Sequence, residues 1–143
     1  MTKPKVSVFF YGSYMDLNIL KEFDVLPGQW EVARVYGYDI VIRPRANLIR
    51  SDRSCCYGIV ATVTHGELDQ LYARIQNVFG HTYRPEPVVA EMLTGAWRPA
   101  LCYIASSMEA GPAANDYVER IVKPARAFKF PEWYIERLET FRS

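Results

Sequence analysis

The order and spacing of the β-prone segments constrain the fold of this chain most strongly. Five segments carry the β-branched, aromatic and apolar side chains typical of strands. They span Lys5–Tyr11, Trp30–Ile42, Cys56–Val63, Tyr83–Met92 and Trp97–Ile104. Several of the connections are too short for the helical crossover that parallel neighbouring strands require. We therefore expect an α+β fold, with a small mixed or antiparallel, barrel-like β-sheet surrounded by helices, and not a Rossmann fold.

Local signals predict helices between and after these strands. Thr64 and Glu67 form a capping box that starts one helix, and Gly80 is expected to end it. Another helix is expected over Met15–Phe23, where apolar residues recur at helical spacing. Two more helices complete the order, at Tyr117–Val122 and at Pro131–Leu138.

Glycines and polar runs predict the turns. Gly37, near the middle of the second strand, indicates a bulge, and Thr94-Gly95 indicates a hairpin. Residues Arg43–Arg53 are polar and include four arginines. We expect this segment to be a loop that runs over the surface.

Charge and composition give no reason to expect a nucleic acid or a membrane as partner. Seventeen basic and 16 acidic side chains give a formal net charge of +1, so nothing electrostatic favours a nucleic acid or an anionic membrane as partner. No apolar run approaches the ~20 residues needed to span a bilayer. The N-terminal segment Met1–Lys5 is short and polar and lacks the features of a signal peptide. We therefore expect one domain over residues 1–143, located in the cytoplasm.

The cysteines and histidines give no sign of a metal centre. Cys55 and Cys56 are adjacent, so in a strand they point to opposite faces, and Cys102 is distant in sequence. The chain has only two histidines and no CxxC pair. We expect the cysteines to be small buried side chains, with neither a metal nor an organic cofactor in the protein.

The segment Phe9–Met15, with the sequence FFYGSYM, is the main candidate for a binding site. Here a buried strand is expected to run into Gly12-Ser13 and then into a helix. Backbone N–H groups in such a turn can hold a carboxylate or carbonyl oxygen. By itself the pattern also fits a purely structural connection, and at this point both interpretations stay open.

This segment resembles the glycine-containing binding loop of gamma-glutamylcyclotransferases, in which a strand ends in Tyr-Gly-Ser. Other short stretches are similar to that family in the same order along nearly the whole chain. They are Tyr57–Val60, Leu68–Leu71, Tyr83, Tyr117–Ile121 and Pro131–Leu138. Each stretch is short, so the evidence lies in their succession.

The resemblance implies an enzyme that cleaves a small γ-glutamyl amide. The α-amine attacks the γ-carbonyl carbon of the same molecule, which yields 5-oxoproline and a free amine. One carboxylate acts as base and then as acid, without a cofactor. The resemblance also implies a set of substrate-binding residues, namely Tyr11, Gly12, Ser13, Tyr14, Tyr83 and Tyr117.

The chain departs from the family at the catalytic glutamate. Judged by the distance to Tyr83, the place of that glutamate is taken by Ile75, which cannot transfer a proton. A literal match of Leu68-Asp69 to the family's segment puts Tyr72 there instead. Neither alignment supplies a carboxylate, so the activity is lost or changed, or another carboxylate has taken over.

Glu86 is the predicted replacement for the catalytic glutamate. It lies between Pro85 and Pro87, which restrict its backbone and would help to position a base. Glu91, further into the same strand, is a weaker candidate. A solvated glutamate in a proline-rich edge segment is the competing interpretation for Glu86.

Arginines that follow the second strand are candidates for binding a substrate carboxylate. Arg43 and Arg45 flank Pro44 at the expected strand end, and a guanidinium group can bind a carboxylate through two hydrogen bonds. We include Arg43 among the predicted substrate-binding residues. A solvated surface loop is the alternative.

The sequence thus predicts a gamma-glutamylcyclotransferase-like enzyme whose partner is a small γ-glutamyl or related amide. A non-catalytic small-molecule-binding domain on the same fold is the first alternative, and Ile75 favours it. Hydrolysis of another small amide is a further alternative, distinguished by its product. The oligomeric state stays open, with a homodimer as one option.

Overall fold

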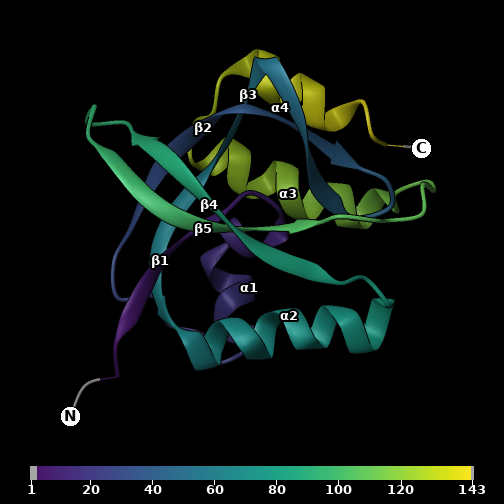
Figure 1. Ribbon diagram of the computed structural model, residues 1–143. Helices are drawn as coiled ribbons and strands as arrows, with labels where there is room; N and C mark the ends of the chain where they lie inside the picture. Colours follow the sequence, from purple (N-terminus) through teal and green to yellow (C-terminus); the bar gives the residue numbers. More distant parts are fainter. Residues whose placement is uncertain (1–2, 143) are drawn as a thin grey trace.

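Five strands close into a barrel in this computed structural model, which describes residues 3–142 (Figure 1). The strands are β1 (Lys5–Phe10), β2 (Trp30–Ile42), β3 (Ala46–Thr64), β4 (Tyr83–Met92) and β5 (Trp97–Ala105). Their order around the barrel is β1-β3-β2-β4-β5. All neighbours are antiparallel except β1 and β5, whose short parallel pairing closes the ring. The predicted α+β fold with a mixed, barrel-like sheet is confirmed.

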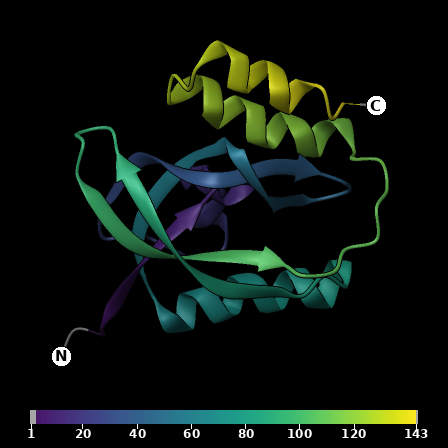
Figure 2. The ribbon, with the colours of Figure 1, turned by 45° about the horizontal axis from the view of Figure 1, so that its top comes forward.

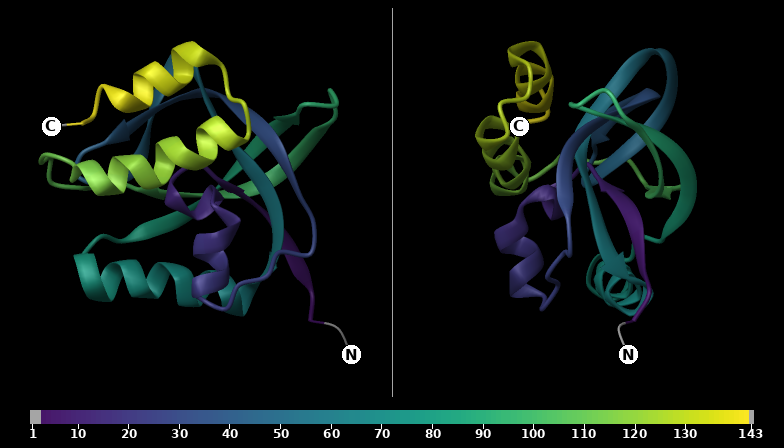
Figure 3. Two further views of the ribbon diagram at one scale, coloured as in Figure 1. Left: turned by 180° about the vertical axis from the view of Figure 1, so that it is seen from behind. Right: turned by 90° about the vertical axis from the view of Figure 1, so that its left-hand side faces the viewer.

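Helices cover two sides of the barrel. They are the 3-10 turn η1 (Ser13–Met15), α1 (Leu17–Glu22), α2 (His65–Phe79), α3 (Asn115–Ala127) and α4 (Glu132–Glu139). Figure 2 shows α3 and α4 side by side on one side of the barrel and α2 along the opposite side. Seen from behind and from the side in Figure 3, α1 lies between α2 and α3. In the described residues 3–142, no helix combines the length and apolar character needed to cross a bilayer.

The local signals in the sequence predict both ends of α2 correctly. The Thr64 side chain accepts a hydrogen bond from the N–H of Glu67, and the Glu67 carboxylate accepts one from the N–H of Thr64, which completes the capping box of α2. Gly80 ends this helix with a left-handed φ of 77°. Gly37 and Gly95 also have positive φ values, at a shift in the β2–β3 register and in the β4–β5 turn respectively.

The expectation of a long loop over Arg43–Arg53 is wrong. Strand β3 begins at Ala46, and residues 46–50 pair with residues 38–42 of β2, so only a short turn separates the strands. The β2–β3 hairpin extends beyond the barrel core, and Ile49 to Arg53 are largely exposed there. Cross-strand backbone hydrogen bonds do not require apolar side chains, so a strand can form here although the polar composition predicts a loop.

Close backbone packing at Gly58 joins β3 to the end of β1. A Cβ atom at Gly58 would lie 2.1 Å from the backbone oxygen of Phe10 and 2.9 Å from Cζ of Phe9. Both phenylalanines are fully buried, with exposed fractions of 0–1%. The missing side chain therefore allows β3 to approach the end of its antiparallel neighbour β1 closely, just before the segment that contains Tyr11 and Gly12.

Replacement of this glycine should destabilise the protein. We expect Gly58→Ala to lower the free energy of unfolding by about 2–3 kcal/mol or more, because the new methyl group overlaps a backbone oxygen that cannot move away. Urea denaturation measures the effect. Gly66→Ala in α2 is the matched control: its Cβ would lie 3.9 Å from the nearest heavy atom, so this variant should be neutral or slightly stabilised. Equal stability of the two variants would contradict the packing argument.

Candidate functional site

The loop after β1 borders a small cavity, which we call the loop cavity. Nine residues line it: Phe10, Tyr11, Gly12, Ser13, Tyr14, Ala46, Tyr72, Ile75 and Tyr83. The structure therefore gathers the loop, the start of β3, one face of α2 and the start of β4 at one place. Its volume of about 30 Å³ has room for about one or two water molecules.

The loop turns sharply because β1 ends at Phe10 and the 3-10 turn η1 begins at Ser13. The N–H of Met15 donates to the carbonyl of Gly12, at an N–O distance of 3.1 Å. The N–H groups of Ser13 and Tyr14 precede this first bond, so the turn provides no internal acceptor for them. Such N–H groups are suited to binding a carboxylate or carbonyl oxygen.

The tyrosines of the loop use their hydroxyl hydrogens inside the protein. Tyr11 is buried and its hydroxyl donates to the carbonyl of Tyr103 at 2.6 Å. The Tyr14 hydroxyl donates to the carbonyl of Leu71 in α2 at 3.0 Å. Each hydroxyl oxygen can still accept a hydrogen bond from a ligand, but the two rings mainly form the wall of the cavity.

Tyr83 and Tyr117, both predicted to line the site, hold the backbone of Ala46. The Tyr83 hydroxyl donates to the carbonyl of Ala46 at 2.5 Å, and the N–H of Ala46 donates to the Tyr117 hydroxyl at 3.0 Å. Ala46 in turn lies against Gly12, where an added Cβ would be only 2.9 Å from the Cβ of Ala46. The two hydroxyl groups therefore position the far wall of the loop cavity.

Burial shapes the electrostatics of these tyrosines. Desolvation raises the pKa of Tyr14 to about 12, although the positive charges of Arg45 and Arg74 oppose the increase. Burial likewise raises the pKa values of Tyr11 and Tyr83 above their ordinary range. All three phenols are thus neutral at physiological pH, and none is a ready base for proton abstraction.

The two residues that stand, in one alignment or the other, at the place of the family's glutamate both line the loop cavity. Tyr72 stacks on Tyr103, with ring centroids 3.9 Å apart and planes 5° from parallel, and its edge meets Tyr14. Ile75 is buried one helical turn further along α2. No aspartate or glutamate is among the described residues that line this cavity, so it lacks a resident carboxylate.

The structure does not bring Glu86 to the loop cavity. Glu86 is exposed on β4 opposite Cys102, whose pKa is raised to about 12 by burial and then by the charge of Glu86. Arg43 is also exposed, with its guanidinium group 5.5 Å from the ring centre of Phe141. The catalytic role of Glu86 and the substrate-binding role of Arg43 stay predictions, without support from this geometry.

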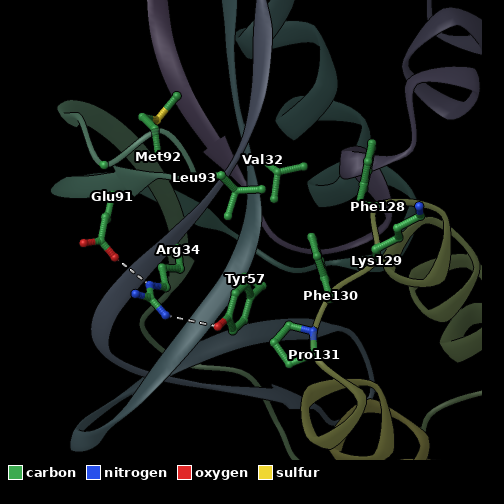
Figure 4. A pocket seen from close by; sticks show the side chains of 11 residues that line it. Val32, Arg34, Tyr57, Glu91, Met92, Leu93, Phe128, Lys129, Phe130 and Pro131 are labelled. Carbon is green, nitrogen blue, oxygen red and sulfur yellow. Dashed lines mark hydrogen bonds and ion pairs between the residues drawn. The ribbon is translucent and has the colours of Figure 1, made fainter.

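Larger hollows lie on other faces of the barrel. One, of about 340 Å³, contains Glu91. Figure 4 shows the Arg34 guanidinium between the Glu91 carboxylate, at 2.6 Å, and the Tyr57 hydroxyl, at 3.3 Å. Hydrogen bonds from Arg34 and then from Tyr36 lower the pKa of Glu91, which makes this carboxylate a weaker base. This hollow is therefore a poor candidate for acid–base chemistry.

Comparison with known proteins gives matches in fold only. No protein-family model and no curated protein matches the chain. A structure named gamma-glutamyl cyclotransferase superposes with a TM-score of 0.80 at 18% identity, covering 97% of this chain and 89% of that one. An uncharacterized human protein gives 0.80 at 18% identity, with coverages of 96% and 88%. The chain has the gamma-glutamyl cyclotransferase-like fold.

The same fold extends to a mouse AIG2-like protein, with a TM-score of 0.58 at 13% identity and coverages of 80% and 82%. At these identities the likeness concerns the backbone and does not fix an activity. On this cyclotransferase-like fold, all four residues of the segment Tyr11–Tyr14 lie at the loop cavity together with Tyr83, and their substrate-binding role stays a prediction.

The surroundings of two residues in this region, Tyr72 and Arg45, do not follow from the sequence. The sequence predicts Tyr72 on the apolar face of the helix and, in one alignment, at the place of the family's glutamate, but it does not predict the stacking on Tyr103. For Arg45 the sequence leaves two interpretations open, a substrate-binding arginine or part of a solvated surface loop, and neither predicts that its guanidinium group lies 4.0 Å from the ring centre of Phe79 and 4.3 Å from that of Tyr117. No local signal in the sequence reveals this position, because the two rings come from α2 and α3.

The raised pKa of Tyr14 predicts a pH-dependent stability. Because the folded-state pKa of about 12 exceeds the ordinary value of 10, the contribution of the neutral side chain is fully present below pH 10 and is lost as the pH rises toward 12. We expect the wild type to lose about 1 kcal/mol more than Tyr14→Phe between about pH 9 and about pH 11, after allowance for partial exposure. Urea denaturation at both pH values measures this difference. Equal losses would mean that Tyr14 ionises freely in the folded protein.

Proposed function

We propose that the loop cavity binds a small γ-glutamyl amide or a related amide. The cyclotransferase-like fold and the segment Tyr11–Tyr14 support this assignment of ligand class. The N–H groups of Ser13 and Tyr14 provide donors for a carboxylate or carbonyl oxygen. Since the cavity has a volume of only about 30 Å³, side chains that line it must move to admit the ligand. Side-chain rearrangements of this kind are common on binding.

The observation that carries the choice of function is the missing carboxylate. Cyclisation requires a group that takes a proton from the attacking amine and gives one to the leaving amine. Tyr72 and Ile75 occupy both positions at which the family resemblance places that group, and neither is suited to the task at neutral pH. The geometry therefore favours a protein that binds its ligand without cyclising it.

Cyclotransfer is the second candidate function, and the fold likeness to gamma-glutamyl cyclotransferase favours it. In this reaction a bond forms between the α-nitrogen and the γ-carbon, the bond to the leaving amine breaks, and 5-oxoproline results. Glu86 is the carboxylate proposed to move the proton. Glu86 lies three residues after Tyr83 on β4 and does not line the loop cavity. Either β4 or the ligand would therefore have to shift to bring the Glu86 carboxylate to the reacting amine.

The first experiment tests binding and turnover together. Purified protein is incubated with a panel of γ-glutamyl amines and γ-glutamyl amino acids, and its melting temperature and the formation of 5-oxoproline are both measured. A ligand at ten times its dissociation constant should raise the melting temperature by about 3–6 °C, with no 5-oxoproline formed. A product formed by hydrolysis, which leaves a free acid, would point to the amide hydrolase.

Two variants test the missing carboxylate directly. We expect Tyr72→Glu or Ile75→Glu to gain 5-oxoproline formation, because a carboxylate at the right place supplies the absent proton transfer; Tyr72→Gln and Ile75→Gln are the matched controls. Activity in the wild type that Glu86→Gln abolishes would establish cyclotransfer instead. No thermal shift with any member of the panel would contradict the proposed ligand class.

A further inference from the structure

A second hollow adjoins the loop cavity, and we call it the arginine cavity. Its volume is about 130 Å³, enough for several water molecules or a small oxyanion. Ser13, Tyr14 and Ile75 line both hollows, so the two are contiguous. Three further lining residues are arginines, namely Arg45, Arg74 and Arg120. No aspartate or glutamate occurs among the described residues of its wall.

The three arginines come from separate parts of the chain. Arg45 lies in the turn between β2 and β3, Arg74 lies on α2, and Arg120 lies on α3. Only the tertiary fold brings them together, in a protein whose formal net charge is +1. Gathering like charges around one hollow costs free energy, and a bound anion offsets that cost.

Arg45 is held in place by two aromatic rings. Its guanidinium carbon lies 4.0 Å from the ring centre of Phe79 and 4.3 Å from that of Tyr117. The rings fix the plane of the guanidinium group but provide no hydrogen-bond acceptor in that plane. Within residues 3–142, its Nε atom is a buried side-chain donor without a hydrogen-bond partner. A buried donor of this kind is costly unless a ligand or water provides an acceptor.

Four other arginines of the protein are paired with neighbouring carboxylates. The four ion pairs found within the described part of the chain involve Arg34, Arg126, Arg137 and Arg142. The arginines of the cavity take part in none of these pairs. Their charge reaches the loop, because Arg45 and Arg74 both oppose the rise in the pKa of Tyr14 that burial causes.

We propose that Arg45, Arg74 and Arg120 form a binding subsite for a phosphate or carboxylate group of a small molecule. Guanidinium groups match the geometry of both oxyanions through paired N–H donors. Three of them favour phosphate, which carries about −1.5 to −2 charges at neutral pH. A ligand held at the loop reaches the subsite through the shared wall at Ser13 and Tyr14. This inference goes beyond the proposed function and does not depend on it.

Direct titration tests the subsite. Inorganic phosphate and malonate are each titrated into the full chain in an isothermal calorimeter, at neutral pH and constant ionic strength. We expect one site per chain for at least one probe, with affinity reduced about tenfold or more in Arg74→Gln and in Arg120→Gln. Arg45→Lys keeps the charge but loses the planar group between the two rings, so it should also weaken binding. Circular dichroism checks that each variant is folded.

Arg84→Gln is the matched control. It removes the same charge from an exposed position on β4 that does not line the cavity, so binding should be unchanged. Binding of phosphate alone supports a phosphate-bearing ligand, and binding of malonate alone supports a carboxylate-bearing one. Absence of binding by both probes, or equal loss in Arg84→Gln and Arg74→Gln, overturns the subsite. The titration involves neither a γ-glutamyl compound nor 5-oxoproline. A negative result would therefore overturn the subsite without contradicting the proposed function.

Discussion

The structure around the site depends on how the first residues of β3 are held. Tyr83 from β4 and Tyr117 from α3 bind the carbonyl and the N–H of Ala46. The buried Asn47 side chain binds both the N–H and the carbonyl of Ala105, at 3.0 and 2.9 Å. Removing any of these partners would leave a buried polar group unpaired, at a cost of about 1–3 kcal/mol. This network fixes one wall of the loop cavity and, through the adjoining turn, the position of Arg45.

The same hydrogen bonds decide which side chains are free to bind a ligand. The hydroxyl groups of Tyr11, Tyr14 and Tyr83 donate their hydrogens to carbonyl groups of the protein. These residues therefore shape the cavity wall and do not supply hydrogen-bond donors to a ligand. Arg45 is the opposite case, because its position is fixed by aromatic rings while its Nε donor is unused. Specificity in this region is therefore expected to come from the guanidinium groups and the loop N–H groups.

The fold of this protein does not by itself fix its chemistry. The backbone follows that of gamma-glutamyl cyclotransferase over 97% of the chain, and the loop cavity has a stacked tyrosine and a buried isoleucine at the two positions where the sequence resemblance implies a carboxylate. A barrel tolerates such changes because its stability comes from strand pairing and the apolar core, which do not depend on the reacting group. The carboxylates Glu86 and Glu91 lie elsewhere on β4.

The sequence by itself determined the strand and helix order, the capping box of α2, the turns at Gly37, Gly80 and Gly95, and the segment that borders the loop cavity. These features depend on the conformational preferences of single residues and on the spacing of apolar side chains, and both can be read from short stretches of sequence. Tertiary structure alone decided that residues 46–55 form a strand, that Glu86 is exposed away from the loop, and that Arg45 lies between Phe79 and Tyr117. Each of these outcomes depends on packing between elements that are distant in the chain. A local sequence pattern cannot predict which aromatic rings, carbonyl groups or charged side chains become neighbours when the barrel closes.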